Sequence, residues 1–277
     1  MYEELVQLVH GVQAYERARD FIVALRAYLI LIFGDMPAVA GIMRIKGPAA
    51  VHPCRVCSIP GIRDTSNGKN TSYYTPLHRA NNIYEFEDLP IRTHEQFVKQ
   101  SKWVADGRKK SNAECTRRSR SCGINGTPLL IRLLSLSVPA LDFMHILENI
   151  LPLLGLDEGS EKYQISSTVL AAIGEACSAA GDTIPACFGA RVPNIYTVRH
   201  FFKAETWILF ATLFGFTVLY NRFKKPQYYT HFVKLVGLIN VCLQFELTHD
   251  DINTLEKGLI NWVKGYERCV GSFLLTQ

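Results

Sequence analysis

The sequence predicts an α/β protein that is predominantly α-helical. Residues 21–33, "FIVALRAYLILIF", form a continuous apolar run that ends at Gly34-Asp35. Continuous apolarity without a polar face is typical of a central strand in a parallel sheet, so we interpret its second half as a buried strand. From Thr127 onward, apolar residues recur at helical spacing. The 277 residues are 48% apolar and 20% charged, which is ordinary for a globular protein with a full core.

The N-terminal half alternates predicted helices with loops. Helical spacing of Leu5, Leu8, Val9 and Val12 predicts a helix over residues 2–15. Further helices are expected over residues 38–43 and 93–110, and a loop-like segment rich in Gly, Pro, Asn and Ser over residues 58–82. A basic run, "RKKSNAECTRRSRS", follows the second of these helices.

The C-terminal half is expected to be helical, with a break at Pro139. An amphipathic helix is expected over residues 166–181, and further helices over residues 201–220, 228–245 and 250–267. The last of them opens with Thr and Asp at its N-cap. We therefore expect three parts: residues 1–60 with the strand, residues 61–126 with loops and basic residues, and the helical residues 127–277.

The apolar segment Trp207–Tyr220 raises the question of a membrane span. It is short of the roughly 20 apolar residues that a spanning helix needs, and charged residues flank it, so we predict a buried helix and no membrane contact. The N-terminus has early acids and no continuous apolar core, unlike a signal peptide. These features predict a protein of the nucleus or cytoplasm, not a secreted one. A membrane-anchored protein is the alternative.

Cys54 and Cys57 are the one closely spaced pair among eight cysteines. In a reducing compartment this spacing is more often a metal or redox site than a disulfide. A closed zinc site needs four ligands, and the nearby donors are His52, His78, Cys115 and Cys122, none at a diagnostic spacing. We therefore expect a structural Zn²⁺ site. The alternatives are two ordinary thiols in a loop and a redox pair.

Three acidic positions are candidates for chemistry. Asp35 follows the predicted strand, where α/β folds place their sites, although Asp is also common in turns. Asp142 and His145 share one face of a helix, or Asp142 is only an N-cap. Glu205 lies in a very apolar helix, so it either faces solvent near the helix N-terminus or is held by a cation.

The basic run supplies a candidate DNA-binding surface. The formal net charge of +5 and the pI of about 8.7 give a mild basic bias that fits a nucleic-acid partner. Cations of such a run would displace counterions from the phosphate backbone, whereas the alternative is a solvated, mobile loop. The residues concerned are Arg108, Lys109, Lys110, Arg117, Arg118 and Arg120.

Several motifs occur in the order of a known family. They are "GDMPAVAGIMRIKG", "PCRVCSIPGI", "YYTPL", "GINGTPLL", "PALDFMHILENILP", "IPACFGARVPNI", "FFKAETWILF" and "YYTHFVKLVGLINVCLQFEL". Over roughly residues 3–267 the chain resembles the transposase-like proteins of fungal genomes related to the Tnp2-type transposases of CACTA (En/Spm) DNA transposons.

The resemblance implies an RNase H-like nuclease core, incomplete here, with a large helical insertion. It implies three acidic residues that hold two Mg²⁺ or Mn²⁺ ions for DNA cleavage and strand transfer. The DNA of transposon ends is the implied partner, and a homo-oligomer is a further possibility. The family's Gly-Asp-x-Pro-Ala acid corresponds to Asp35, its Asp-x-x-His signature to Asp142 and His145, and Glu205 is the candidate for the last acid.

This chain also departs from the family pattern. The family's first acid should lie upstream of "YEELVQLVHGV", the connection near Leu154 looks shortened, Pro48 replaces a histidine, and "CVGSFLLTQ" leaves the pattern. We therefore expect a fragment or decayed copy, inactive as a nuclease, that still binds DNA. The rival hypothesis is a non-catalytic, zinc-stabilised helical interaction module.

Overall fold

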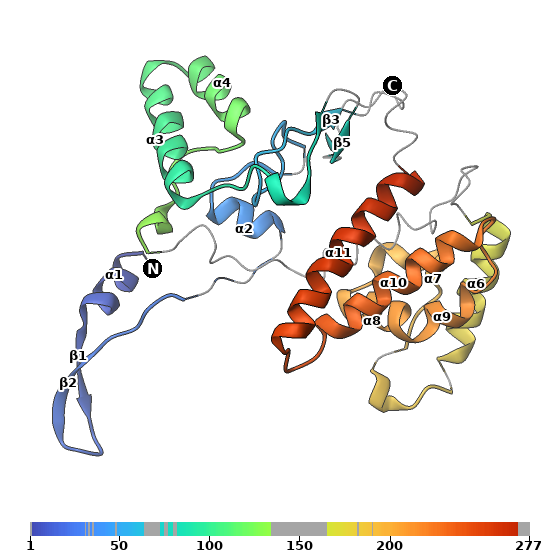
Figure 1. The fold of residues 1–277 in the computed structure, drawn as a ribbon. Helices are drawn as coiled ribbons and strands as arrows, with labels where there is room; N and C mark the ends of the chain where they lie inside the picture. Colours follow the sequence, from blue (N-terminus) through green and yellow to red (C-terminus); the bar gives the residue numbers. More distant parts are fainter. Residues whose placement is uncertain are drawn as a thin grey trace. The chain divides into compact units, whose positions relative to one another are not determined.

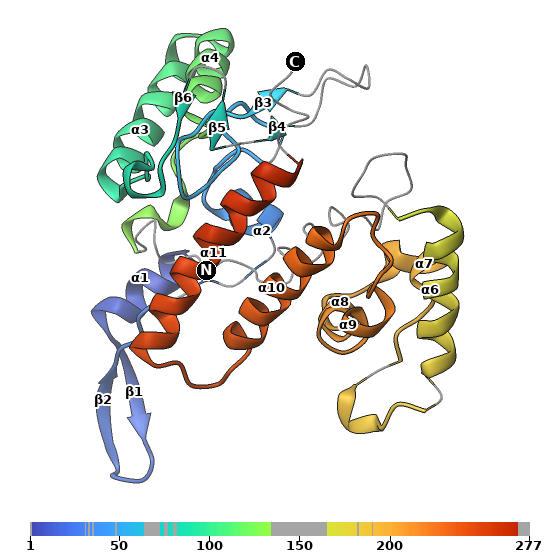
Figure 2. The ribbon, with the colours of Figure 1, turned by 45° about the vertical axis from the view of Figure 1, so that its right-hand side comes forward.

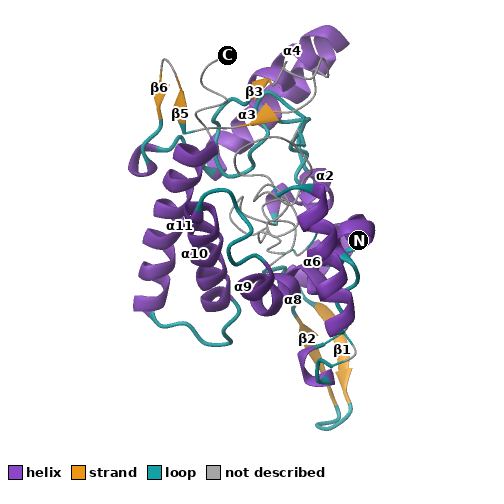
Figure 3. Cartoon of the chain, turned by 90° about the vertical axis from the view of Figure 1, so that its right-hand side faces the viewer, coloured by secondary structure: helices purple, strands orange, loops and turns teal. Residues whose placement is uncertain are grey.

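The structure is a computed structural model, predominantly helical, with strands that pair only two by two in the part of the chain described (Figures 1 and 3). It describes residues 2–30, 32, 34, 36–47, 49–63, 73–74, 77–79, 82–133, 165–181, 183–189 and 191–270. The chain separates into two compact units. Unit 1 comprises Met1–Leu77 and Tyr84–Asp142, and unit 2 comprises His78–Ile83 and Phe143–Gln277.

Unit 1 carries short strands and four helices within its described residues. The helices are α1 (Tyr2–His10), α2 (Met36–Ile42), α3 (His94–Lys110) and α4 (Asn112–Cys122), with 3₁₀ turns η1 (Phe86–Asp88) and η2 (Leu129–Arg132). Its strands are β1 (Val12–Glu16) with β2 (Phe21–Leu25), and β3 (Ile62–Arg63) with β4 (Tyr73–Tyr74), both pairs antiparallel.

The N-terminal segment differs from the expected helix followed by a buried parallel strand. Helix α1 ends at His10 because Gly11 takes φ +104°, a conformation that glycine adopts without strain. The chain then forms the β1–β2 hairpin, in which Val12 pairs with Leu25. The apolar run thus begins as an exposed antiparallel strand, and residues 26–30 form no strand. An RNase H-like sheet is not seen among the strands that the structure describes.

The core of unit 1 joins α2 to the α3–α4 pair. Its buried side chains come from α2 and the residues after it, from α3, and from the end of α4. Ile45 and Ile124 form an antiparallel bridge, and the Lys46 amide donates to the Gly123 carbonyl at 2.8 Å. The core residues are Val39, Met43, Ile45, Phe97, Val104, Cys122 and Ile124.

Unit 2 is helical apart from the short pair β5 (His78–Arg79) and β6 (Asn82–Ile83). Its helices are α6 (Ser167–Ala180), α7 (Ile195–Val198), α8 (Ala204–Leu209), α9 (Gly215–Val218), α10 (Pro226–Cys242) and α11 (His249–Val270). Two 3₁₀ turns, η4 (Ala186–Phe188) and η5 (Arg199–Phe201), and a π-helical turn, η6 (Phe210–Phe214), complete it. Figure 2 shows α10 and α11 side by side.

The apolar segment Trp207–Tyr220 builds the core of unit 2. Trp207, Phe210 and Phe214 are buried and contact a cluster that also includes Phe232 and Val236 of α10. Among the described residues, no helix combines the length and the apolarity that crossing a bilayer requires. The segment therefore packs as the buried helical element that the sequence predicts.

Helix α11 begins with the predicted capping residues. The Asp251 amide donates to Thr248 Oγ1 at 3.1 Å, and the Thr248 amide donates to Asp251 Oδ2 at 2.9 Å. This reciprocal pair is a capping box, which satisfies two backbone N–H groups at the start of the helix. Trp262 of α11 then stacks on His231 of α10, with ring centroids 4.5 Å apart.

A glycine pair in unit 2 tests the packing of α9 against α10. A Cβ added to Gly215 would lie 2.4 Å from Cζ of the buried Phe232 ring, whereas one added to Gly237 would meet nothing within 4 Å. We expect Gly215→Ala to lower the free energy of unfolding by about 1–3 kcal/mol through overpacking. Gly237→Ala should raise it by about 0.5–1 kcal/mol, since alanine restricts the unfolded chain. Urea unfolding followed by tryptophan fluorescence measures both, and equal effects would contradict the packing.

Burial and the neighbouring Lys234 lower the pKa of His231 from 6.5 to about 4. Between pH 4 and 6.5 the imidazole is protonated in the unfolded chain but mostly neutral in the folded one. The contribution of His231 to the free energy of unfolding is therefore fully present above pH 6.5 and falls as the pH drops from 6.5 to 4. After discounting for partial exposure, we expect a loss of about 1–2 kcal/mol. Urea unfolding at pH 7 and pH 4.5 should show that His231→Phe, which keeps the ring stack, removes part of this loss. The exposed His200 serves as control, since His200→Gln should leave the whole loss in place.

Candidate nucleic-acid interface and the Cys54–Cys57 turn

The basic run forms a helix, α4, that packs against α3 (Figure 1). Ser111 separates the two helices, with an extended backbone at φ −166° and ψ 159°. Its Oγ accepts from the Glu114 amide at 3.0 Å, so Ser111 is the N-cap of α4. Gly123 ends α4 in the left-handed conformation at φ +76°. The alternative interpretation of the run as a solvated, mobile loop is therefore wrong, because local capping residues divide the run into two helix ends.

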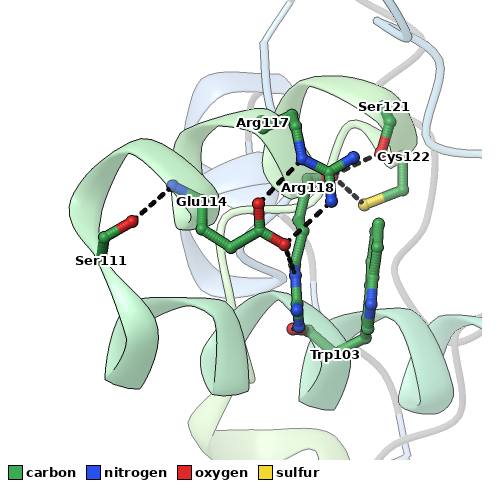
Figure 4. Close-up of polar contacts among 7 residues, drawn as sticks. All are labelled: Trp103, Ser111, Glu114, Arg117, Arg118, Ser121 and Cys122. Atoms are coloured by element: carbon green, nitrogen blue, oxygen red, sulfur yellow. Dashed lines mark hydrogen bonds and ion pairs between the residues drawn. The ribbon is translucent and has the colours of Figure 1, made fainter.

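Arg118 lies in the interface between the two helices. Its Nε donates to Glu114 Oε1 at 2.6 Å and its Nη1 to the Trp103 carbonyl at 2.7 Å, and the guanidinium lies 4.9 Å from the Trp103 ring centroid (Figure 4). A Cβ on Gly107 would lie 2.8 Å from Arg118 Cδ, so α3 needs glycine here. Arg118 is 7% exposed. It joins α3 to α4 and has little surface left for DNA.

Glu114 holds a second arginine on the outer side of α4. Arg117 donates from Nε and Nη2 to both Glu114 carboxylate oxygens, each at 2.8 Å (Figure 4). The hydrogen bonds from Arg117 and Arg118 lower the pKa of Glu114 to about 2. Glu114 therefore stays ionised at every physiological pH and partly neutralises Arg117.

The other cations of the run face solvent. Arg108, Lys110 and Arg120 are exposed, and Lys109 pairs with Asp106 at 2.8 Å across one helical turn. Three of these cations lie in the last turn of α3, where positive charge also stabilises the helix C-terminus. Residues 94–122 hold eight Lys and Arg against three Asp and Glu, an excess of five. This excess equals the formal net charge of the whole chain, +5. The two helices and the residue between them, which we call the α3–α4 hairpin (residues 94–122), therefore carry the entire basic bias of the chain.

The Cys54–Cys57 turn brings its two thiols together. Cys54 Sγ accepts hydrogen bonds from the amides of Val56 at 3.3 Å and Cys57 at 3.4 Å, and the Cys57 thiol donates to it. These donors stabilise a thiolate, so the Cys57 hydrogen bond, the two amides and the Arg92 charge together lower the pKa of Cys54 against the opposing effect of its burial. The Cys54 hydrogen bond and burial raise the pKa of Cys57.

Arg92 holds this turn through hydrogen bonds to its backbone, and no pattern in the sequence predicts that role. Its Nε donates to the carbonyls of Cys54 at 3.2 Å and Cys57 at 3.0 Å, and its Nη1 donates to the Cys122 carbonyl at 2.9 Å. Its Nη2 is buried and has no hydrogen-bond partner among the residues that the structure describes. One guanidinium thus connects the turn to the end of α4, and Cys57 bridges Ile91 next to it.

The further zinc ligands stay a prediction. His52 Nδ1 lies 2.9 Å from the Ser58 carbonyl, and His78 pairs with Ile83 through the backbone. Cys115 lies half-buried on α4, and Cys122 Sγ donates to the Arg118 carbonyl at 3.2 Å. The described ranges contain no group of three or more His, Cys, Asp or Glu residues able to hold a metal ion.

The predicted acids are only partly covered by the structure. Asp35, Asp142 and His145 lie outside the described residues. Glu205 is exposed in the first turn of α8, where its charge favours the helix N-terminus. This is the solvent-facing alternative of the two that the sequence leaves open. Convergence of the three carboxylates on one metal pocket stays a prediction.

Comparisons with known proteins add no relative. No family model, curated protein or solved structure matches this chain.

Arg118 and Arg120 lie on the same helix, α4, so equal substitutions at the two positions separate a structural arginine from an exposed one. We expect Arg118→Gln to lower the free energy of unfolding by about 2–4 kcal/mol, because it leaves the Trp103 carbonyl and Glu114 without their buried partner. Arg120→Gln removes the same charge from an exposed side chain and should change stability by less than about 0.5 kcal/mol. Thermal unfolding of both variants distinguishes the two roles. Equal destabilisation would show that Arg118 is no anchor.

Proposed function

We propose that this chain is a transposase-derived protein that binds DNA through the α3–α4 hairpin. One observation carries the proposal, namely that the hairpin holds the whole net positive charge of the chain. A charge excess on one pair of helices, next to a nearly neutral remainder, is the electrostatic footprint of a surface that contacts phosphates.

The exposed cations differ in what they offer to a phosphate. Arg108, Lys110 and Arg120 are solvent-exposed. Lys109 and Arg117 are exposed too, but each is paired with an acid of its own helix that a phosphate would have to displace. Arg118 is buried and holds the hairpin in shape. Three of the six predicted DNA-binding residues are thus the primary contacts.

The ancestral chemistry belongs to the same proposal. The motif order supports descent from a metal-dependent DNA-cleaving enzyme with an RNase H-like core, in which Asp35, Asp142, His145 and Glu205 served Mg²⁺ or Mn²⁺. Carboxylates suit these hard cations, and two such ions activate the nucleophile and stabilise the leaving oxygen of a phosphodiester. Of this ancestry, the exposed cations of the α3–α4 hairpin support the DNA-binding part.

A second candidate is a protein-interaction module, favoured by the β1–β2 hairpin. Large apolar side chains of β2 and the residues after it are exposed. A two-stranded hairpin is only marginally stable on its own, so a partner that covers these side chains would stabilise it. Contiguous exposed apolar side chains mark interaction surfaces. They are Phe21, Ile22, Leu25, Tyr28 and Ile30.

The salt dependence of DNA binding tests the proposal. We expect the logarithm of the association constant for a double-stranded oligonucleotide to fall steeply with the logarithm of salt concentration, and the triple variant Arg108→Gln, Lys110→Gln, Arg120→Gln to flatten that slope by about 2–3. Fluorescence anisotropy over a salt series measures it. Incubation with Mg²⁺ or Mn²⁺ tests separately whether the ancestral cleavage activity is present.

A control of equal charge lies in unit 2. Arg222, Lys224 and Lys225 are also exposed, and their three glutamine substitutions should leave the slope unchanged. Equal loss in both triple variants would remove the hairpin from the proposal. Salt-insensitive capture of a protein partner, without DNA affinity, would favour the interaction module. Nicking that Asp35→Ala abolishes would show that cleavage is retained.

A further inference from the structure

We infer that the open edge of β2 is a dimerisation surface, on which β2 of a second copy of this chain pairs antiparallel about a two-fold axis at Val23. The inference rests on the open edge, on the apolar side chains of the strand and on the order of the charges at its two ends. It names the partner of the exposed β1–β2 hairpin, so it rests on the second candidate function and not on DNA binding.

One edge of β2 has no partner strand in the described part of the chain. The sheet has two strands in the order β1–β2, so one edge of β2 pairs with β1 and the other is open (Figure 1). An open edge presents unpaired N–H and C=O groups, and proteins usually protect it with charged side chains, proline or a bulge. Residues 21–25, "FIVAL", are apolar throughout and pair with β1 without a bulge. This edge is therefore free to pair with another strand.

The open edge of β1 is less suited to a partner. Strand β1 carries the polar Gln13 and the charged Glu16. Glu16 also forms an ion pair with Arg19 of the turn, at 3.5 Å. Charged side chains on an edge strand oppose its pairing with a further strand. A second copy therefore pairs through β2 and not through β1.

Antiparallel pairing of two β2 strands places apolar residues opposite each other on both faces of the sheet. With Val23 on the two-fold axis, Phe21 faces Leu25 of the second copy, and Ile22 faces Ala24. Side chains alternate along a strand, so Phe21, Val23 and Leu25 share one face, and the other two residues share the opposite face. Phe21, Ile22 and Leu25 are between 45% and 65% exposed, so pairing covers apolar surface that a monomer leaves in water.

The charges at the two ends of β2 select this register. Asp20 precedes the strand and Arg26 follows it, and both are exposed. In the two-fold arrangement Asp20 of each copy faces Arg26 of the other, and opposite charges directly across from each other stabilise a strand pair. A shift of the register by one residue would place Asp20 opposite Leu25 or Ala27 instead. Two ion pairs thus flank an apolar centre, and the strand is complementary to its own copy.

Sedimentation velocity of the full chain over a concentration series tests the pairing. Two short strands make a small interface, so we expect a monomer–dimer equilibrium with a dissociation constant of about 10–100 µM. Asp20→Asn and Arg26→Gln each remove both ion pairs, and each should raise that constant about five- to tenfold. Tyr15→Phe removes only the hydroxyl that donates to Asp20, and Arg17→Gln removes an exposed charge of the turn, so both should leave the constant unchanged.

Charge reversal gives a test that does not depend on the stability of one variant. Asp20→Lys alone, or Arg26→Glu alone, places like charges opposite each other at both ends of the strand pair. Each variant by itself should stay monomeric at concentrations at which the unsubstituted chain dimerises. An equimolar mixture of the two should dimerise, because opposite charges then meet at both ends. Far-UV circular dichroism checks that each variant is folded.

A single cysteine on the axis locates the register. In Val23→Cys the substituted residue faces its own copy, so mild oxidation should join two tryptic peptides of residues 20–26 in a species that dithiothreitol separates. Ala24→Cys is the control, because position 24 lies diagonal to its own copy, about 7–8 Å away, and should give a much lower yield. Mixing unlabelled and ¹⁵N-labelled chains should give a joined species of mixed isotope content, which shows that the bond links two chains.

Three outcomes would overturn the inference. A chain that stays monomeric over the whole concentration series would leave the β1–β2 hairpin to a different partner. A dimer that neither charge reversal nor mixing affects would have its interface elsewhere. Assembly that keeps growing with concentration would indicate head-to-tail pairing of β2 with β1 of the next copy. None of the three bears on DNA binding, which the salt slope decides separately.

Discussion

The buried guanidinium of Arg92 is the constraint on which the architecture of unit 1 depends. It lies just before the N-cap Thr93 of α3, and it donates to carbonyls of the Cys54–Cys57 turn and of the last residue of α4. Three segments far apart in sequence thereby share one cation. Hydrogen bonds from a charged donor are worth about 1.5–3 kcal/mol each, and they offset the large cost of burying that charge.

A second guanidinium, that of Arg118, joins helices α3 and α4 in the same way as Arg92 joins the end of α4 to the Cys54–Cys57 turn. Both residues are arginines, a residue type that is mostly exposed in proteins, and both are buried. Burial of Arg118 requires Gly107 at the crossing point and Glu114 one turn before it on α4. The DNA-binding hypothesis is narrowed by this packing, since one cation of the run is structural and the others project from the helices that it joins.

The sequence predicts those features that are encoded locally. The N-terminal cap of α11 and the amphipathic helix α6 follow from residues within one or two turns of each other. The failures have tertiary causes. Apolarity over residues 21–33 indicates burial, but β2 is exposed, and Gly11 ends α1 through a backbone conformation that periodicity does not register.

The candidate site divides in the same way. Cys54 and Cys57 are recognisable from their spacing, whereas Arg92 lies 35 residues beyond Cys57 and has no local signal. Arg118 and Arg120 stand two positions apart on one helix, and only packing against α3 separates a buried anchor from an exposed contact. The one usable signal was Gly107, a poor helix former inside α3 that marks a close approach.

The turn and the hairpin are physically coupled through Arg92. Its Nε is shared between the carbonyls of Cys54 and Cys57, while its Nη1 holds the carbonyl of Cys122 at the end of α4. The guanidinium is planar and rigid, so a shift of the two turn carbonyls changes its hydrogen bonds to α4 as well. A change that moves the carbonyls of this turn would therefore reach the C-terminal end of α4 through the same guanidinium. The Cys54–Cys57 turn and the C-terminal end of α4 are thus held by the same side chain.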